Sequence, residues 1–284
     1  MTVVTLLHPG SMGAAVGTQA RRTEATVRWV GTGRSAETGR RAKDAGLAEC
    51  AELATALDGS DIVVSICPPA HAEDVARSVA ESTERAFTGV YLDANAISPA
   101  RMQRVAALLP TALLADGAII GEPPMTPGTT RLYVCGHAEP IARLFEGTAL
   151  EVVTLSGDIG QASALKMAYA SYQKASRVLG AVAHALARRH DVEDHLAREA
   201  DLLHSRPLAD TDGFRAAASR AWRWAPEMRE ADEALRAAGL PGDMAIGAAT
   251  ALERWTSVKD RDDLDVAAVL ALLSKPPPNG EAAR

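Results

Sequence analysis

The stretch that decides the fold is residues 3–13, VVTLLHPGSMG, in which a β-branched run meets a glycine-containing turn. Residues 3–7 predict a buried strand, and a helix is predicted directly after the turn. Gly10 and Gly13 occupy the second and third glycine positions of the pattern G-x-G-x-x-G, whereas His8 replaces the first. The second glycine lets a phosphate approach the backbone, and the third lets the helix pack close to the strand. The segment therefore predicts a strand–turn–helix unit whose helix N-terminus can hold an anion.

Composition narrows the class of protein. The chain has 284 residues, 47% of them hydrophobic, and its 30 basic and 36 acidic side chains give a formal net charge of −6. A globular protein of this length is expected to have two domains, and its negative charge argues against nucleic acid as a partner. No apolar run approaches the roughly 18 residues that cross a bilayer, and no leader pattern precedes the first strand. We expect a cytoplasmic protein without a membrane partner.

Up to residue 156, short β-branched runs alternate with alanine-rich helical stretches. This alternation is typical of βαβ units and a parallel sheet. About seven strands are expected, at residues 3–7, 25–30, 61–67, 90–92, 112–115, 131–135 and 150–154. A helix is expected from Ser98, a serine N-cap that precedes a proline. Residues 1–156 therefore predict a Rossmann-type, doubly wound α/β domain.

From Gly157 the strand signals vanish and helical periodicity takes over. Residues 159–190 contain no proline and predict one helix of roughly 30 residues, about 45 Å long. Later helices are expected at residues 192–204, 212–224, 225–237, 244–258 and 265–273. We expect an all-helical substrate and dimerisation domain at residues 157–275, followed by a disordered tail at residues 276–284.

Cysteine, histidine and aromatic residues add smaller constraints. The three cysteines are widely spaced: Cys50, Cys67 and Cys135. This spacing fits neither a disulfide framework nor a zinc site, so we expect reduced thiols, most of them buried. His184, His190 and His195 have no compact ligand spacing, and no metal is expected. Because only 4% of the residues are aromatic, the core is expected to consist of Ala, Leu and Val.

The second predicted strand leads into residues 30–35, VGTGRS, about 20 residues after the glycine turn. An NAD site would offer Asp or Glu to the ribose hydroxyl here, but no acid occurs before Glu37. Arg34, the hydroxyl of Ser35 and free backbone amides beside Gly33 suit a 2′-phosphate better. We therefore expect NADP(H) as the cofactor. The alternative is that Arg34 is a solvated loop cation.

With these residues in place, the chain resembles the β-hydroxyacid dehydrogenase and 6-phosphogluconate dehydrogenase-like superfamily, which also contains the imine reductases. Four segments carry the resemblance: Gly10-Ser11-Met12-Gly13, Gly33-Arg34-Ser35, Asp93 to Pro99, and Gly157, Gly160 and Lys166. The first resembles the phosphate turn of the family, and the second resembles the loop that follows the second strand in NADP-using members. Asp93 to Pro99 resembles the segment beside the nicotinamide, and the last segment resembles the start of the interdomain helix. The C-terminal half is most similar to a poorly characterised subgroup with a phosphogluconate-dehydrogenase-like C-terminal domain. The resemblance implies that Lys166 is catalytic.

The chain also departs from the family pattern. Residues 120–124, Ile-Gly-Glu-Pro-Pro, stand where the family usually has Val-Ser-Gly-Gly, so the serine and the second glycine that bind a carboxylate are missing. Glu122 would repel a carboxylate substrate at close range. Ala170 stands where the family usually has asparagine, four residues after Lys166. We therefore expect a small carbonyl or hydroxy compound rather than a simple 3-hydroxy acid.

The expected site comprises a proton donor and its neighbours. Lys166 is expected to act as general acid/base, and the alternative is an ordinary lysine on the helix surface. Tyr169 is expected to be a second proton donor or a stacking surface for the substrate, and the alternative is a tyrosine packed in the core. Asn95, at the end of a strand, is expected to contact the nicotinamide or the reacting oxygen, or else to form an Asx turn that caps the Ser98 helix. The cofactor contacts are expected at Gly10, Ser11, Met12, Gly13, Gly33, Arg34, Ser35, Cys67, Pro68 and Asn95. The substrate contacts are expected at Gly121, Glu122, Lys166, Tyr169 and Gln173.

Together these features predict an NADP(H)-dependent oxidoreductase that acts on a small molecule. An imine reductase is a neighbouring possibility, although the resemblance implies that this branch commonly carries another proton donor at the position of Lys166. A sensor or scaffold that binds NADP without turnover is a third possibility, because His8, Glu122 and Ala170 depart from the family pattern. Family architecture and the long helix also predict a homodimer.

Overall fold

The computed structural model describes residues 1–82, 86–203, 207, 210–261 and 263–275. Two compact units, Met1–Ser171 and Tyr172–Arg284, divide the chain inside one long helix. The predicted domain boundary at residue 157 stays a prediction. The tail predicted at residues 276–284 lies outside the described residues.

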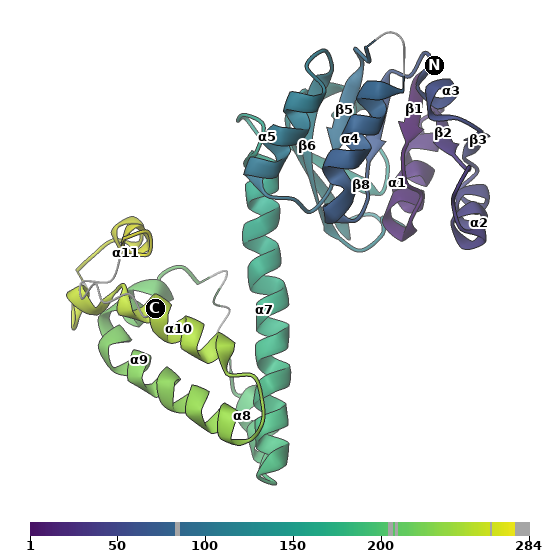
Figure 1. Cartoon of the computed structure of the whole chain (residues 1–284). Coiled ribbons are helices and arrows are strands. Elements are labelled where there is room, and N and C mark those ends of the chain that lie inside the picture. Colours follow the sequence, from purple (N-terminus) through teal and green to yellow (C-terminus); the bar gives the residue numbers. More distant parts are fainter. Residues whose placement is uncertain (83–85, 204–206, 208–209, 262, 276–284) are drawn as a thin grey trace. The chain divides into compact units, whose positions relative to one another are not determined.

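The first unit is built on an eight-stranded sheet with the order β3-β2-β1-β4-β5-β6-β7-β8 (Figure 1). Its strands are β1 (Val3–Leu6), β2 (Thr26–Val30), β3 (Ala48–Cys50), β4 (Ile62–Ser65), β5 (Val90–Asp93), β6 (Leu113–Gly121), β7 (Thr130–Gly136) and β8 (Leu150–Thr154). Neighbouring strands pair in parallel except β6 and β7, which are antiparallel. The strand order reverses between β1 and β4, so the predicted doubly wound α/β fold is confirmed. In such sheets, ligands bind at the carboxyl ends of the strands beside this reversal.

The sequence did not predict β3. This strand has three residues, Ala48, Glu49 and Cys50, and none of them is buried. It pairs with β2 at the edge of the sheet, from Arg28 opposite Ala48. An edge strand this short has no apolar alternation, which is the signal that strand prediction uses.

Helices cover both faces of the sheet. They are α1 (Ser11–Arg21), α2 (Ala36–Asp44), α3 (Leu53–Leu57), η1 (Pro69–His71), α4 (Ala72–Glu81), α5 (Pro99–Leu108) and α6 (Glu139–Leu144). The predicted start of α5 is confirmed, because the Ser98 hydroxyl accepts a hydrogen bond from the Arg101 amide at 3.2 Å and Pro99 is the first helical residue. Serine and proline suit these positions because the cap satisfies a free amide and proline has none to satisfy.

Successive residues of the central strands pack into two separate apolar clusters. Val90 and Leu92 of β5 pack with residues of α1, α2 and α6, whereas Tyr91 packs with residues of α4 and α5. Side chains alternate between the faces of a sheet, so these are the cores on its two sides. Aliphatic side chains dominate both clusters, as the low aromatic content predicted.

Helix α7 (Gln161–Arg189) begins in the first unit and continues into the second. Its 29 residues confirm the long helix predicted at residues 159–190. The second unit also contains α8 (Glu193–Asp201), α9 (Gly213–Ala237), α10 (Asp243–Glu253), η2 (Thr256–Val258) and α11 (Val266–Leu272). Its core lies where Ala218 and Ala221 of α9 pack with Trp255, Val258 and Val269.

Two helices predicted at residues 212–224 and 225–237 form one helix, α9, with Pro226 inside it. An interior proline removes one hydrogen bond and costs a helix about 3 kcal/mol. Buried residues before and after it, Ala225 and Leu235, hold α9 against its neighbours. Tertiary packing therefore overrides the local signal that separated the two helices.

The three cysteines are free thiols, as expected. The expectation that most are buried was wrong, since only Cys135 is fully buried and Cys50 and Cys67 are partly exposed. Both lie where strands end, Cys50 in β3 and Cys67 just after β4, and sheet margins are less covered than sheet centres. No helix within the described residues is long and apolar enough to cross a membrane.

Candidate functional site at the carboxyl ends of β1, β4 and β5

The glycine turn joins β1 to α1 and forms one wall of a hollow of about 290 Å³. The hollow is lined by His8, Pro9, Gly10, Ser11, Met12, Gly13, Arg34, Thr38, Ile66, Cys67 and Pro68. It therefore brings together three segments that are distant in the sequence: the turn after β1, the loop after β2 and the end of β4. Seven of the predicted cofactor contacts line it: Gly10, Ser11, Met12, Gly13, Arg34, Cys67 and Pro68.

The two glycines of the turn have opposite surroundings. A Cβ placed on Gly10 would have no heavy atom within 4 Å, whereas a Cβ on Gly13 would lie 2.2 Å from the His8 carbonyl oxygen. Gly13 thus allows α1 to pack against the end of β1, and Gly10 leaves open space in front of the helix N-terminus. These are the two uses that a dinucleotide-binding turn makes of its second and third glycines.

The loop after β2 supplies a cation to the hollow. Arg34 is exposed, and its Nη2 donates a hydrogen bond to the Leu7 carbonyl at 3.4 Å. Gly33 has a φ of +75°, a conformation that glycine adopts without strain. The Ser35 hydroxyl accepts a hydrogen bond from the Thr38 amide at 3.2 Å and so caps α2. Gly33 and Ser35 do not line the hollow themselves.

His8 also lines a second hollow. The second hollow has a volume of about 180 Å³ and is lined by Leu7, His8, Val30, Arg34, Leu53, Val75 and Ser78. His8 and Arg34 line both hollows. The pKa of His8 is lowered to about 4, mainly by burial and further by the positive charge of Arg34 and by His71. The imidazole is therefore neutral at physiological pH.

Asn95 ties the ends of β4 and β5 together. Its Oδ1 accepts a hydrogen bond from the Cys67 amide at 2.6 Å, and its Nδ2 donates to Ser65 Oγ at 3.0 Å and to Asp93 Oδ2 at 2.9 Å. An Asx turn is present, but it is made by Asp93, whose Oδ1 accepts from the Asn95 amide at 3.0 Å. The alternative in which Asn95 caps the α5 helix was wrong, because Ser98 provides that cap. The cofactor and catalytic roles of Asn95 stay predictions.

A buried carboxyl group stands beside this network. Asp93 is 1% exposed, and its pKa is raised to about 6 by burial and by the charge of Asp116, against the lowering effect of its bonds with Asn95. Asp93 and Asp116 are paired in register on β5 and β6. Burial and the charge of Asp93 also raise the pKa of the Cys67 thiol to about 11. Cys67 is therefore a neutral thiol rather than a nucleophilic thiolate at pH 7.

Asp116 holds the start of α7. Its Oδ2 accepts hydrogen bonds from the amides of Gly160 at 2.9 Å and Ser163 at 3.0 Å, and its Oδ1 accepts from the Ser163 hydroxyl at 2.7 Å. One turn later, Lys166 Nζ donates to the Ile119 carbonyl at 2.5 Å. The first turns of α7 therefore lie along β6, and the half-buried Lys166 is held at a defined place beside the carboxyl end of that strand.

Sequence reasoning missed Asp116. The available signal was an acidic residue inside the otherwise apolar stretch 113–120, LLADGAII. A buried carboxylate requires hydrogen-bond donors, and a helix N-terminus provides free amides. The sequence alone does not show that the helix beginning 45 residues later supplies them.

The remaining predicted substrate residues are more scattered. Gly121 has a φ of +131° and ends β6, and Glu122 follows it as an exposed side chain. The loop beyond them is fastened at two points, where Thr130 Oγ1 donates to the Glu122 carbonyl at 2.5 Å and Gln19 Nε2 donates to the Pro124 carbonyl at 2.7 Å. Tyr169 is half-buried on α7, one turn after Lys166. Gln173 is half-buried and belongs to the second unit.

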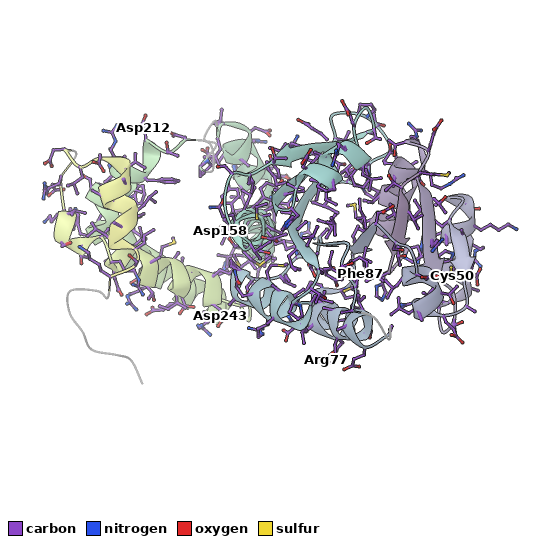
Figure 2. The ribbon with its side chains drawn as sticks, turned by 90° about the horizontal axis from the view of Figure 1, so that it is seen from above. Cys50, Arg77, Phe87, Asp158, Asp212 and Asp243 are labelled. Carbon is purple, nitrogen blue, oxygen red and sulfur yellow. The ribbon has the colours of Figure 1, made fainter. Side chains whose placement is uncertain are left out.

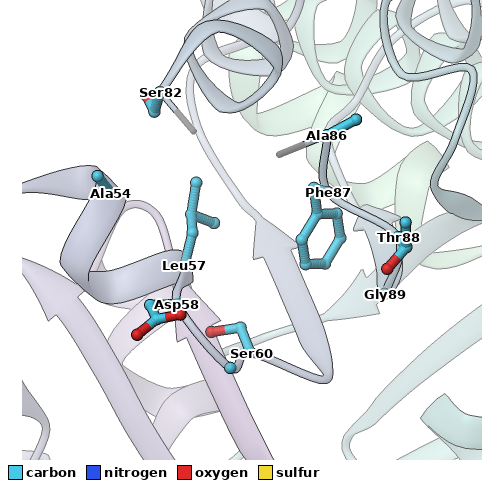
Figure 3. A pocket seen from close by; sticks show the side chains of 10 residues that line it. Ala54, Leu57, Asp58, Ser60, Ser82, Ala86, Phe87, Thr88 and Gly89 are labelled. Carbon is cyan, nitrogen blue, oxygen red and sulfur yellow. The ribbon is translucent and has the colours of Figure 1, made fainter. Parts of the chain in front are cut away.

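A further hollow of about 580 Å³ lies at the amino ends of β4 and β5 (Figure 3). Leu57, Asp58 and Ser60 line it just before β4, and Phe87 and Gly89 line it just before β5. Parallel sheets bind ligands at the carboxyl ends of their strands rather than here. Within the described part of the chain, no three His, Cys, Asp or Glu side chains gather as a metal site.

The sheet with the long helix after it matches the fold of solved structures described as similar to 3-hydroxyacid dehydrogenases and as a reductive aminase. Residues 187–255 match the family model described as Domain of unknown function (DUF1932). A conserved protein of unknown function, described as structurally similar to 3-hydroxyacid dehydrogenases, is 20% identical with a TM-score of 0.57, over 90% of this chain and 98% of its own. The reductive aminase from Aspergillus terreus, in complex with NADPH and ethyl levulinate, is 19% identical with a TM-score of 0.72, over 95% of this chain and 99% of its own.

Among curated proteins, an uncharacterized 28.5 kDa protein from Methanothermus fervidus is 27% identical over 142 residues, or 50% of this chain. The match spans 54% of the length of that relative. The resemblance expected from the sequence is therefore confirmed at the level of the fold.

Proposed function

We propose that this chain is an NADP(H)-dependent oxidoreductase that transfers a hydride between the nicotinamide and a small carbonyl or hydroxy compound. The main support is the hollow at the carboxyl end of β1, where the open face of Gly10, the N-terminus of α1 and Arg34 meet. A helix N-terminus attracts phosphate through its free amides and its dipole. A guanidinium adds bidentate hydrogen bonds to a second phosphoryl group.

The residues of this hollow fit the proposed cofactor. The amides at the start of α1 would hold the pyrophosphate, and Arg34 with the amides near Gly33 would hold the 2′-phosphate. Cys67 and Pro68 would form the opposite wall, and Asn95 keeps the Cys67 amide in place through its 2.6 Å hydrogen bond. When bound, NADP(H) supplies the hydride chemistry, and the protein supplies orientation and proton transfer.

Lys166 is the proposed proton donor and acceptor. Its ammonium gives a proton to the oxygen of the substrate during reduction, and its amine accepts that proton during oxidation. Before the proton is transferred, the positive charge stabilises the developing alkoxide. The hydrogen bond to the Ile119 carbonyl and the anchoring of α7 by Asp116 keep the ammonium in place. Tyr169, on the same helix face one turn later, offers a hydroxyl or a flat surface to the substrate.

The proposed substrate is a small compound without a carboxylate beside the reacting carbon. Glu122 is exposed at the end of β6, in the region where hydroxyl and amide groups would be needed to hold an acid. A fixed negative charge repels a carboxylate. Gly121 and Gln173 complete the set of proposed substrate contacts.

Reduction of an imine is the second candidate, and the likeness to the fold of a reductive aminase favours it. Retention of Lys166 favours carbonyl chemistry instead. The third candidate is a protein that binds NADP without turnover. We would add the purified chain to NADPH, follow quenching of cofactor fluorescence, and then measure NADPH oxidation with matched panels of ketones and cyclic imines. Binding with no turnover on either panel would favour the third candidate.

The test of the catalytic proposal is Lys166→Ala with Lys174→Ala as the matched control, since Lys174 is an exposed lysine on the same helix. We expect Lys166→Ala to lower kcat roughly 10²–10⁴-fold without weakening NADPH binding, because general acid catalysis typically has this size. Lys174→Ala should keep wild-type turnover. Intact turnover in Lys166→Ala would show that the proposed mechanism is wrong.

We also propose a homodimer formed through the helical half. Within the second unit, Val178 and Leu179 of α7 are 53% and 48% exposed, and Leu202 and Leu203 are 67% and 72% exposed. A contiguous exposed apolar patch is typical of a surface that binds another chain, and we propose that these side chains contribute to one. Light scattering at micromolar concentration should give the mass of two chains, and a monomer would contradict the proposal.

A further inference from the structure

His8 stands where the dinucleotide-binding pattern has its first glycine, and it lines both hollows beside the turn. Its Nδ1 is buried and has no hydrogen-bond partner within the described residues. An orphaned buried nitrogen is costly. A ligand that enters the hollows and bonds to Nδ1 would remove this cost.

Two basic side chains act on His8. Arg34 faces it from the loop after β2, and His71 faces it from η1. Burial and these two neighbours lower the pKa of His8 to about 4. Besides His8 and Arg34, the titratable residue that lines the hollow at the glycine turn is Cys67. The pKa of its thiol is raised to about 11, so the thiol is uncharged across the neutral range. The free protein therefore holds a neutral imidazole beside a guanidinium.

A phosphoryl group placed between His8 and Arg34 would reverse this balance. Nearby negative charge favours the imidazolium, and a protonated imidazole can donate from both ring nitrogens. Nδ1 would then donate a charge-assisted hydrogen bond to a phosphate oxygen. A glycine at this position could supply neither the charge nor the donor.

We propose that His8 is a proton-linked recognition residue for the cofactor, neutral in the free protein and protonated when a phosphoryl group of the dinucleotide enters the hollow. This inference rests on the proposed function. Because binding takes up a proton, affinity for the dinucleotide rises as pH falls through the neutral range. Either the pyrophosphate or the 2′-phosphate could supply the negatively charged oxygen. Comparing NADP+ with NAD+, which has the pyrophosphate but lacks the 2′-phosphate, distinguishes the two.

The experiment is calorimetric titration of the full chain with NADP+ and with NAD+ between about pH 6 and 8, in two buffers with different heats of ionisation. The difference in heat between the buffers counts the protons taken up. One fully linked proton changes Kd about tenfold per pH unit, and we expect NADP+ to bind about three- to tenfold more tightly at pH 6 than at pH 8. Uptake with both cofactors assigns the pyrophosphate; uptake with NADP+ alone assigns the 2′-phosphate.

The key variant is His8→Gln, and His71→Gln is its control because His71 is an exposed histidine that also influences the pKa of His8 but does not line the hollow. His8→Gln should abolish the difference between buffers, whereas His71→Gln should keep it. The 2′-phosphate itself titrates near pH 6, and subtracting the His8→Gln result from the wild-type result removes its contribution. If His8→Gln does not fold, His8→Gly restores the glycine of the pattern and serves the same purpose.

Two failures can be told apart. If neither NADP+ nor NAD+ binds, both this inference and the proposed function are wrong. If the dinucleotide binds with equal proton uptake in wild type and His8→Gln, or with none in either, only the role of His8 is overturned.

Discussion

The carboxylate of Asp116 accepts a hydrogen bond from the Ser163 hydroxyl at 2.7 Å, so that a residue of the central sheet holds the first turn of the longest helix. The same carboxylate accepts the amides of Gly160 and Ser163. A negative charge at a helix N-terminus is favourable because it faces the positive end of the helix dipole. Asp116 thereby determines where Lys166 lies, one turn further along α7.

Removing this charge should destabilise the first unit. In Asp116→Asn, one acceptor oxygen becomes a donor that faces the amides of Gly160 and Ser163 or the Ser163 hydroxyl. We expect the free energy of unfolding to fall by about 2–4 kcal/mol, since a buried amide or hydroxyl loses its charged acceptor. Urea unfolding followed by circular dichroism measures the loss.

The matched control is Asp158→Asn, because Asp158 is an exposed acid just before the same helix, labelled in Figure 2. Its unfolding free energy should stay within about 0.5 kcal/mol of wild type, which is usual for surface substitutions. Equal stability of the two variants would mean that Asp116 does not anchor α7.

The two glycines of the turn should respond differently to alanine. Gly10→Ala should leave stability within about 0.5 kcal/mol of wild type, because its Cβ enters open space. The same Cβ would occupy the path of the pyrophosphate, so NADPH binding should weaken at least about tenfold. Gly13→Ala should lower the unfolding free energy by about 2–4 kcal/mol, because its Cβ meets the His8 carbonyl. Thermal unfolding and NADPH fluorescence separate the two effects, and unchanged NADPH binding in Gly10→Ala would argue against a dinucleotide at this turn.

Asp93 should make stability depend on pH. Its pKa of about 6 in the folded chain exceeds the ordinary value of 3.8, so the folded state binds more protons than the unfolded state between about pH 4 and 6. The contribution of Asp93 to stability is therefore complete below about pH 4 and is lost as pH rises through 6. His8, with its lowered pKa, acts in the opposite direction over the same range.

Comparison with Asp93→Asn isolates the carboxyl group from His8. The stability of wild type relative to this variant should fall by about 2–3 kcal/mol between about pH 4 and 6.5. Urea unfolding at a series of pH values provides the measurement. A constant difference across that range would show that Asp93 does not titrate in it.

Periodicity in the sequence predicted the sheet and the long helix because their burial repeats along the chain. It failed for β3, which is too short and too exposed to repeat, and for α9, where packing around Pro226 outweighs the local penalty. The turn at Gly10 and Gly13 was predictable because both glycines act on the local backbone.

The rest of the candidate site depends on contacts between distant segments. Asp116 meets Ser163 47 positions later, and Asn95 meets Cys67 28 positions earlier. His8 counted only as a broken motif in the sequence, since its significance comes from Arg34 in the loop after β2 and His71 in η1. Such relationships require the fold before the residues can be interpreted.

Arg34 should decide between the two nicotinamide cofactors. It lines both hollows beside the turn, and residues 30–36, which end β2 and form the loop after it, contain no acidic residue, so we expect its guanidinium to bind a 2′-phosphate. Charge-assisted hydrogen bonds of this kind contribute about 1.5–3 kcal/mol, and Arg34→Ala should weaken NADP+ binding roughly 10–100-fold. NAD+ lacks the 2′-phosphate, so its Kd should change less than about threefold on the same reasoning. Arg40→Ala, an exposed arginine on α2, is the control and should leave both Kd values unchanged. Titration of each variant with both cofactors tests the prediction, and a parallel loss of NADP+ and NAD+ would place Arg34 at the pyrophosphate instead.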